Sequence, residues 1–203
     1  MKKNKISKNW INRQRRDIYV RKSKVEGYRS RAVYKLEEIN QKFKIFHNGV
    51  SVLDLGAAPG SWTQYISKNY KNIKLASIDL KKFDEVENTF QITGDFTEDI
   101  YKQKILNFFQ GKIDIIISDM AVNTTGNKNL DSIQTSELCL DAMRFSKEVL
   151  KKNGTFVSKI FIGSTFNEII DKSKKIFKKN KVFKPSASRK ESKESFIVCS
   201  MLR

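Results

Sequence analysis

The sequence predicts an α/β fold built on a doubly wound, mostly parallel β-sheet, and three observations support this fold class. After residue 50, short apolar runs of strand length alternate with longer segments of helical period. One of these runs leads directly into a turn with two glycines and then into a helix. The chain has 203 residues, 39% of them hydrophobic, which suits one such domain and is too few for two comfortable ones. We therefore expect one domain with basic appendages.

The beginning of the chain changes character near residue 28. Residues 1–28 lack a sustained apolar period, which predicts a basic arm that is helical in part. From Ser30 onward apolar residues recur at helical spacing, with Ser30 as an N-cap and Gly49 as a stop, so residues 30–45 predict an amphipathic helix. We therefore divide the chain into a basic arm, residues 1–28, and one folded domain, residues 29–203.

Strands and helices alternate through the rest of the chain. The predicted parallel strands are Ser51–Leu55, Leu75–Leu80, Thr89–Thr93, Asp114–Ser118 and Thr155–Phe161, and the helices between and after them cover residues 61–69, 97–109, 132–152 and 164–179. Two final strands, Val182–Pro185 and Ser195–Met201, are joined by the polar loop Ser186–Glu194, which is short enough for an antiparallel pairing. A terminal hairpin on such a sheet is characteristic of class I methyltransferases.

The segment Val52–Trp62 is the strongest single pattern in the sequence. Gly56 and Gly60 permit a tight turn and a close approach to a ligand, and the next helix directs free N–H groups toward it. This arrangement predicts an adenosine-containing cofactor, with Gly60 in its cradle. The spacing is not GxGxxG, however, and the glycines alone fit an ordinary strand–helix connection equally well. Trp62 is expected either to contact the cofactor or to pack in the core.

Polar residues gather at the ends of the predicted strands, which a parallel sheet places at one edge. They are Asp54, Asp79, Asp95, Asp119 and Lys159. Asp79 lies about twenty residues past Gly60, where an acidic side chain in this fold accepts hydrogen bonds from a ribose. Asp95 is a candidate acceptor for an adenine amino group. A helix-capping role is the alternative for Asp95, because Asp is favoured just before helices.

The net charge of +18 is concentrated at the two ends of the chain. Residues 1–35 hold 13 basic and 2 acidic residues and residues 151–203 hold 14 and 4, whereas residues 36–150 hold 13 and 16. Two basic blocks around a cofactor-type core predict a nucleic-acid partner, bound through phosphate neutralisation. The six arginines near the N-terminus suit phosphates, and three aromatic residues among them suit bases. These are Arg13, Arg15, Arg16, Arg21, Arg29 and Arg31, with Trp10, Tyr19 and Tyr28. The alternative, a solvated lysine-rich surface, best suits Lys174–Lys181.

Several classes of protein do not fit the sequence. No apolar run approaches the ~20 residues needed to cross a bilayer, and the N-terminus lacks the apolar stretch of a secretory signal. Cys139 and Cys199 have no CxxC or His partner, so we expect buried free thiols and neither a metal site nor a disulfide framework. We expect a cytoplasmic protein, although the acid-free basic residues 2–16 also suit a mitochondrial transit peptide.

Five segments together resemble the FtsJ/RrmJ-type family of ribosomal RNA large subunit (uridine-2′-O-)-methyltransferases. They are Ser30–Leu36, Asp54–Tyr65, Ser118–Ala121, Val157–Phe161 and Lys184–Glu194, and the resemblance covers roughly residues 22–203. The motifs occur in the family's order. Three positions depart from the family pattern: Ser61 replaces a frequent glycine, Val122 a common proline and Phe196 a common tyrosine. None of these changes removes a catalytic group, although Val122 leaves the path of its loop open.

The resemblance implies the class I S-adenosylmethionine-dependent methyltransferase fold and a set of site residues. The family's Lys–Asp–Lys–Glu tetrad matches Lys35, Asp119, Lys159 and Glu194. Gly60, Trp62, Asp79, Asp95 and Asp119 are then the expected S-adenosylmethionine contacts. The implied reaction moves a methyl group to a ribose 2′-hydroxyl of RNA, most simply a uridine of 23S ribosomal RNA. The implied partners are ribosomal RNA and the large subunit, with the enzyme acting as a monomer.

The 2′-hydroxyl is a weak nucleophile, so the reaction needs in-line alignment and removal of the hydroxyl proton. Lys159 is the candidate base, with its neutral form favoured by desolvation and by the nearby charge of Lys35. Asp119 and Glu194 oppose that trend and are assigned mainly to orientation, and Lys35 also suits a developing alkoxide. In a competing assignment, Lys159 only positions the ribose and the proton leaves late.

The sequence also leaves other functions open. Transfer RNA or an mRNA cap are alternative substrates, and a catalytically silent RNA-binding ribosome-assembly factor is an alternative to an enzyme. An NAD-type oxidoreductase on the same kind of sheet is a further alternative, against which the glycine spacing, the terminal hairpin and the lack of a proton donor for hydride transfer all argue.

Overall fold

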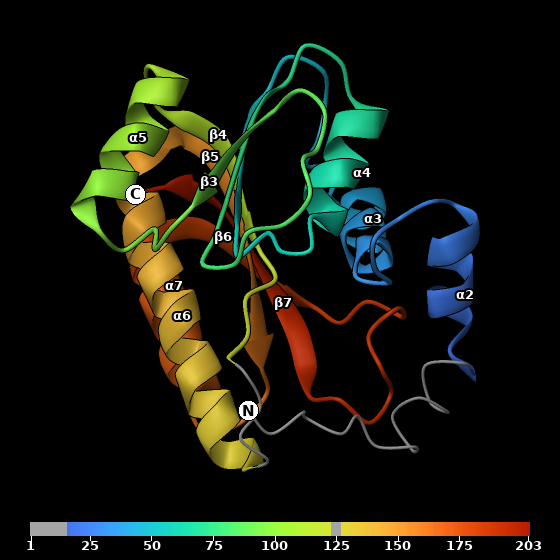
Figure 1. Ribbon diagram of the computed structural model, residues 1–203. Coiled ribbons are helices and arrows are strands. Elements are labelled where there is room, and N and C mark those ends of the chain that lie inside the picture. Colours follow the sequence, from blue (N-terminus) through green and yellow to red (C-terminus); the bar gives the residue numbers. More distant parts are fainter. Residues whose placement is uncertain (1–15, 123–126) are drawn as a thin grey trace, which may run out of the picture.

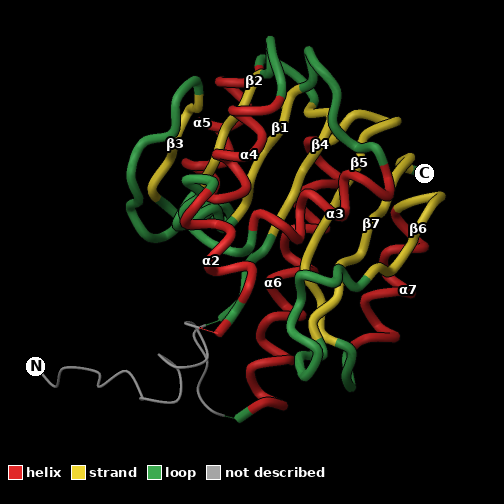
Figure 2. The backbone as a smooth tube through the Cα atoms, turned by 90° about the vertical axis from the view of Figure 1, so that its right-hand side faces the viewer, coloured by secondary structure: helices red, strands yellow, loops and turns green. Residues whose placement is uncertain are grey.

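A computed structural model describes residues 16–122 and 127–203 of the chain, and its centre is a seven-stranded sheet. The strand order is β3-β2-β1-β4-β5-β7-β6, which can be followed across Figure 2. The strands are β1 (Ser51–Leu55), β2 (Lys74–Asp79), β3 (Thr89–Thr93), β4 (Ile113–Ser118), β5 (Leu150–Phe161), β6 (Phe177–Phe183) and β7 (Glu194–Leu202). β1 to β5 pair in parallel, and β7 runs antiparallel to both β5 and β6. The predicted doubly wound sheet with a terminal antiparallel pair is confirmed.

The described helices cover both faces of the sheet (Figure 1). They are α2 (Ile18–Val25), α3 (Val33–Phe43), α4 (Ser61–Asn69), α5 (Asp99–Phe109), α6 (Lys128–Val149) and α7 (Phe166–Ile176). α5, α6 and α7 pack on one face, and α3 and α4 on the other. None of the described helices is both long and apolar enough to cross a membrane.

Alternation of side chains along the central strands explains why the sheet has two cores. In β4, Ile116 points into the core beneath α5 and α6, whereas Ile115 and Ile117 point into the core beneath α3 and α4. All three are at most 3% exposed. A strand covered on both faces reads as a continuous apolar run, as parallel strands do. Because β1 to β5 pair in parallel, their carboxyl ends lie at one edge of the sheet.

The boundary between α6 and β5 differs from the prediction. α6 ends at Val149 instead of near residue 152, and β5 follows at once with the buried Leu150. Leu150 pairs with Ile113 before the register of the β4–β5 ladder shifts. Gly154 lies in the shifted segment, where a Cβ atom would come within 2.9 Å of two backbone carbonyl oxygens. Burial of Leu150 thus draws the strand back toward the helix.

The lysine-rich segment also differs from the prediction, because its first residues end a helix and its remainder forms a strand. α7 ends at Ile176 instead of near residue 179, and β6 begins at Phe177 instead of near Val182. Phe177 is fully buried and stacks on Phe156, with 5.9 Å between ring centroids. Exposed lysines follow it along the sheet edge, where charge discourages pairing with another chain.

The range expected to be a basic arm contains a helix that contacts the folded domain. Asp17 caps α2 by accepting hydrogen bonds from the N–H groups of Tyr19 and Val20, and it forms an ion pair with Arg31. The Tyr19 ring lies 5.4 Å from that of Tyr34 on α3. Residues 1–15 lie outside the described part of the chain, and with them Trp10, Arg13 and Arg15.

Candidate active site

The four residues of the predicted tetrad meet at the carboxyl edge of the sheet. Lys35 Nζ lies 2.9 Å from Glu194 Oε2 and 3.3 Å from Asp119 Oδ2. Lys159 Nζ donates to the other Asp119 carboxylate oxygen at 2.9 Å and to the Asp119 carbonyl oxygen at 2.7 Å. Asp119 therefore holds both lysines.

Four elements of the fold supply these side chains. Asp119 directly follows β4, and Lys159 lies near the end of the neighbouring parallel strand β5. Glu194 begins β7, where it pairs with Phe161 of β5. Lys35 comes from α3 between the buried residues Tyr34 and Leu36, so its helix is fixed against the sheet. The arrangement depends on residues that are up to 159 positions apart in the chain.

The charges of the tetrad stabilise one another in a buried setting. Burial disfavours the ammonium form of Lys35, but the carboxylates of Asp119 and Glu194 outweigh that effect and raise the pKa of Lys35. Burial likewise opposes ionisation of Asp119, but Lys159 and Lys35 lower its pKa below the usual range. Lys35 thus stays a cation and Asp119 an anion throughout the neutral range.

The polar loop before β7 fixes the orientation of Glu194. Ser188 Oγ donates to Glu194 Oε1 at 2.7 Å, leaving Oε2 to Lys35. Glu38 of α3 accepts hydrogen bonds from the backbone N–H groups of Ser186 and Ala187, at 2.6 and 2.8 Å. Glu38 lies three residues after Lys35 on the same side of the helix. This helical spacing from Lys35 is the feature of the sequence that could have indicated a role for Glu38 near the site.

A cavity of about 630 Å³ opens beside the tetrad at the ends of β1 to β4. It is lined by three of the strand-end carboxylates that the sequence predicted, Asp79, Asp95 and Asp119. Gly56 also lines it, and a Cβ atom there would lie 2.1 Å from the Met120 side chain. A much smaller pocket of about 40 Å³, lined by Asp54 and Trp62 among others, shares Gly56 and Asp119 with the first.

The residues of the larger cavity fit an adenosine-containing cofactor. Asp79 is held by the backbone N–H groups of Ala58 and Lys81, at 2.9 and 2.7 Å, which turns its carboxylate toward the glycine turn. Asp95 uses Oδ1 to accept from the N–H and hydroxyl of Thr97 in the turn before α5. The N-cap of α5 is Glu98, so the alternative expected for Asp95, a helix cap, was wrong. Carboxylate acceptors in a cavity of this size suit ribose hydroxyls and an amino group.

Gly60 shapes the turn itself. Its φ of 96° lies in the left-handed region, and a Cβ atom would lie 2.6 Å from Arg29 and 2.8 Å from Phe83. Arg29 donates to the carbonyl oxygens of Pro59, Asp84 and Glu85 at 2.7 to 3.0 Å. This guanidinium therefore ties the glycine turn to the segment after β2, a role that the sequence did not reveal.

The side chain of Trp62 serves packing. It is 3% exposed, its indole N–H donates to the Ala32 carbonyl at 2.8 Å, and its ring lies 5.7 Å from that of Phe196. Of the two roles expected for it, these contacts account for core packing, and it reaches the cofactor side only as part of the small pocket's wall. Cys139 and Cys199 are buried free thiols, as expected.

The seven-stranded sheet and the carboxylate-lined cavity at its carboxyl edge define a class of enzyme, the S-adenosylmethionine-dependent methyltransferases. Residues 28–201 match the family model of the FtsJ-like methyltransferases. The chain belongs to this family.

Individual relatives agree with this assignment. Ribosomal RNA large subunit methyltransferase E of Pelagibacter ubique is 64% identical over 203 residues, which cover all of both chains. The Rickettsia akari protein of the same name is 46% identical over 198 residues, covering 95% of this chain and 87% of that one. A solved Plasmodium falciparum structure, described as a ribosomal RNA methyltransferase, aligns with a TM-score of 0.77 at 34% identity and covers 86% and 98% of the two chains.

We expect Asp54→Asn to change how stability depends on pH. Burial raises the pKa of Asp54 to about 7, with Asp119 and Asp79 adding to the effect and the Thr63 hydroxyl opposing it. The folded protein then keeps a proton that the unfolded chain loses above about pH 4, so stability falls between about pH 4 and 7, by up to roughly 4 kcal/mol. The asparagine cannot ionise, and urea titrations should show a flatter profile.

Asp114→Asn is the matched control, because the charged partner Lys151 and the N–H and hydroxyl of Ser51 lower the pKa of Asp114 despite its partial burial. Its contribution is present above about pH 4 and is lost only in acid. Equal slopes for wild type and Asp54→Asn would contradict the burial argument.

Arg29→Lys should weaken S-adenosylmethionine binding about tenfold, since an ammonium cannot bridge carbonyls on two segments as the guanidinium fork does. Calorimetric titration measures the effect, with the exposed Arg21→Lys on α2 as a control that should bind normally. Unchanged affinity in Arg29→Lys would mean that the turn holds its shape without this clamp.

Proposed function

We propose that this protein transfers a methyl group from S-adenosylmethionine to the 2′-hydroxyl of a uridine in 23S ribosomal RNA of the large subunit. One observation carries the proposal: Asp119 belongs at once to the cofactor cavity and to the Lys–Asp–Lys–Glu tetrad. The names of the two bacterial relatives support ribosomal RNA as the substrate. The bound cofactor supplies an electrophilic methyl group, and the chain supplies alignment and proton transfer.

In this mechanism Lys159 removes the proton from the 2′-hydroxyl. A neutral amine has two N–H donors and one lone pair, and both donors of Lys159 are used by Asp119. The remaining tetrahedral position is then the lone pair, directed by the two bonds to Asp119. Asp119 therefore orients the lone pair of Lys159, and it also lines the cofactor cavity.

Lys35 and Glu194 hold the ribose. Lys35 remains charged, so it stabilises negative charge that develops on the 2′-oxygen. Glu194, turned by Ser188, keeps Lys35 in place and accepts from a neighbouring ribose hydroxyl. All four groups come from one chain, which supports a monomeric enzyme. We place it in the bacterial cytoplasm, where large subunits are assembled.

Purified protein, S-adenosylmethionine and large subunits that lack ribose methylation provide the test. We expect one 2′-O-methyluridine per subunit, found by nuclease digestion and mass spectrometry of the 23S RNA. Transfer RNA and capped RNA serve as competing substrates. If the protein binds subunits but yields no methylated nucleotide, it is a silent assembly factor; if transfer RNA is methylated instead, the reaction class stands and the substrate is wrong.

Lys159→Ala should lower kcat by a factor of about 100 to 10,000, the usual contribution of a general base, while S-adenosylmethionine affinity changes little. Lys159→Met keeps the packing volume and should show the same loss. Lys152→Ala removes an exposed lysine from the same strand and serves as the control. A Lys159 variant with most of its activity would remove this residue from the mechanism.

Removing residues 1–15, which contain six basic and no acidic residues, should weaken binding to ribosomal RNA and reduce its salt dependence. Binding measured between about 50 and 200 mM salt gives the slope. A variant in which the exposed Lys178 and Lys179 of edge strand β6 are replaced by glutamine is the control, because it removes positive charge from a solvated surface outside residues 1–15. Identical salt slopes for the shortened and full-length proteins would contradict a role of residues 1–15 in binding RNA.

A further inference from the structure

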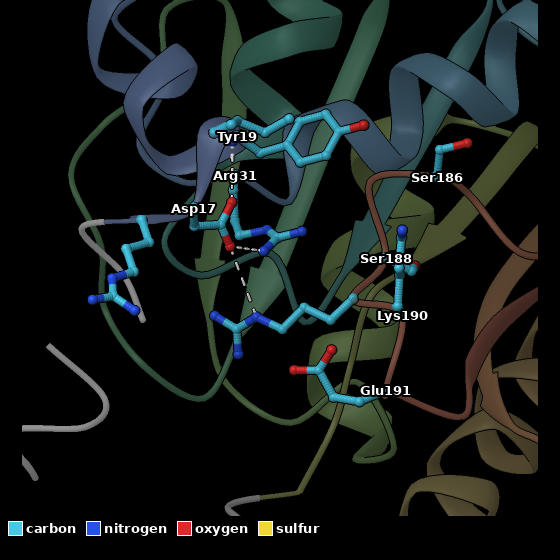
Figure 3. Close-up of a pocket in the computed structure, with 10 residues that line it drawn as sticks. Asp17, Tyr19, Arg31, Ser186, Ser188, Lys190 and Glu191 are labelled. Carbon is cyan, nitrogen blue, oxygen red and sulfur yellow. Dashed lines mark hydrogen bonds and ion pairs between the residues drawn. The ribbon is translucent and has the colours of Figure 1, made fainter. Parts of the chain in front are cut away.

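A second cavity, of about 900 Å³, lies beside the loop before β7 (Figure 3). Its walls are the N-terminal end of α2, the segment before α3 and the loop before β7. The lining residues are Arg16, Asp17, Ile18, Tyr19, Arg31, Ser186, Ser188, Arg189, Lys190 and Glu191. Four of these are cations and two are anions, so the cavity has a net charge of +2. Such a cavity attracts anionic ligands.

The cations of this cavity differ in how strongly the protein itself uses them. Arg31 forms an ion pair with Asp17 and donates a hydrogen bond to the Ala187 carbonyl oxygen. Its side chain is only 16% exposed. It therefore holds the loop before β7 against α2. Arg189 is 31% exposed, and its Nε lies 3.8 Å from Asp17 Oδ2. That long contact orients the guanidinium without saturating its five donors.

The cavity adjoins the tetrad through one residue. Ser188 lines the cavity and also donates to Glu194 at 2.7 Å, and Arg189 is the next residue in the chain. In RNA, the carbon that bears the 2′-hydroxyl is bonded to the carbon that bears the 3′-phosphodiester. A ribose whose hydroxyl reaches Lys159 therefore brings that phosphate close to the tetrad, and the phosphate needs a cation there.

We propose that this cavity binds the phosphodiester on the 3′ side of the methylated ribose, and that Arg189 is its principal ligand. Arg16 and Lys190, both exposed, add charge around it, whereas Arg31 is a structural cation. The guanidinium fork matches two phosphate oxygens. The proposal rests on the proposed function and adds to it the group that sets the register of the RNA strand.

Full-length protein and undermodified large subunits allow the test, with Arg189→Gln compared with Lys152→Gln on β5. We expect Arg189→Gln to raise the KM for subunits, and the Kd measured without S-adenosylmethionine, about tenfold. The slope of log Kd against log salt should fall by about one, while kcat and cofactor affinity stay near wild type. Arg189→Lys should restore the salt slope but only part of the affinity, because it keeps the charge and loses the fork.

The two proposals fail in different ways. A wild-type protein that binds subunits but does not methylate them contradicts the proposed function, and the Kd and salt slope of Arg189→Gln still report on the cavity. A KM, Kd and slope for Arg189→Gln equal to those of Lys152→Gln would overturn the phosphate site. A thermal melt of Arg189→Gln that matches wild type confirms that the comparison concerns binding.

Discussion

The structure depends on one carboxylate, Asp119, that two lysines share and whose side chain is only 18% exposed. An isolated charge in such a place is unfavourable, and removing one partner would leave the other charge unpaired. Here Asp119 contacts both lysines, and Glu194 gives Lys35 a second carboxylate neighbour. Because the partners come from α3, β4, β5 and β7, the pairing also fixes how these elements sit at the edge of the sheet. The ion pairs that offset the desolvation of these charges therefore also align the four elements.

This cluster adjoins two cavities of different chemistry. In the first, Asp79, Asp95 and Asp119 offer acceptors that suit the hydroxyl and amino groups of the cofactor. In the second, arginines and a lysine offer donors that suit phosphate. Asp119 lines the first cavity, and Ser188 links the second to Glu194. A methyl donor in the first cavity and an RNA strand at the second would therefore both lie next to the tetrad that contains Lys159.

The sequence was most informative where local patterns dictate structure. The apolar runs predicted β1 to β5, and the strand ends predicted the carboxylates at one edge, because parallel strands leave no other arrangement. The tetrad came from the resemblance, since Lys35 and Glu194 alone read as solvated surface residues. The prediction that the helix continues to residue 179 in the lysine-rich segment was wrong, because burial of Phe177 makes the rest of that segment an edge strand.

The remaining features depend on long-range contacts that a sequence does not display. Arg29 and Arg31 matched the pattern of phosphate ligands, yet both bind carbonyl oxygens or carboxylates of the protein itself. Glu38 binds two N–H groups 148 and 149 residues away. Trp62 opens a helix beside the cofactor turn, but its ring faces Phe196. In each case a tertiary partner decides which of two chemically reasonable roles a side chain takes.

Direct titration of Lys35 by NMR tests the central claim, that the carboxylates of Asp119 and Glu194 keep this lysine charged inside the protein. Lysine labelled with ¹³C and ¹⁵N, with the signal assigned by comparison with Lys35→Arg, reports the protonation of its side-chain nitrogen in the intact enzyme. The account predicts a pKa above the ordinary value of 10.5. A Lys35 that loses its proton below that value would show that burial outweighs the two carboxylates, and it would contradict the assignment of Lys35 as the fixed cation.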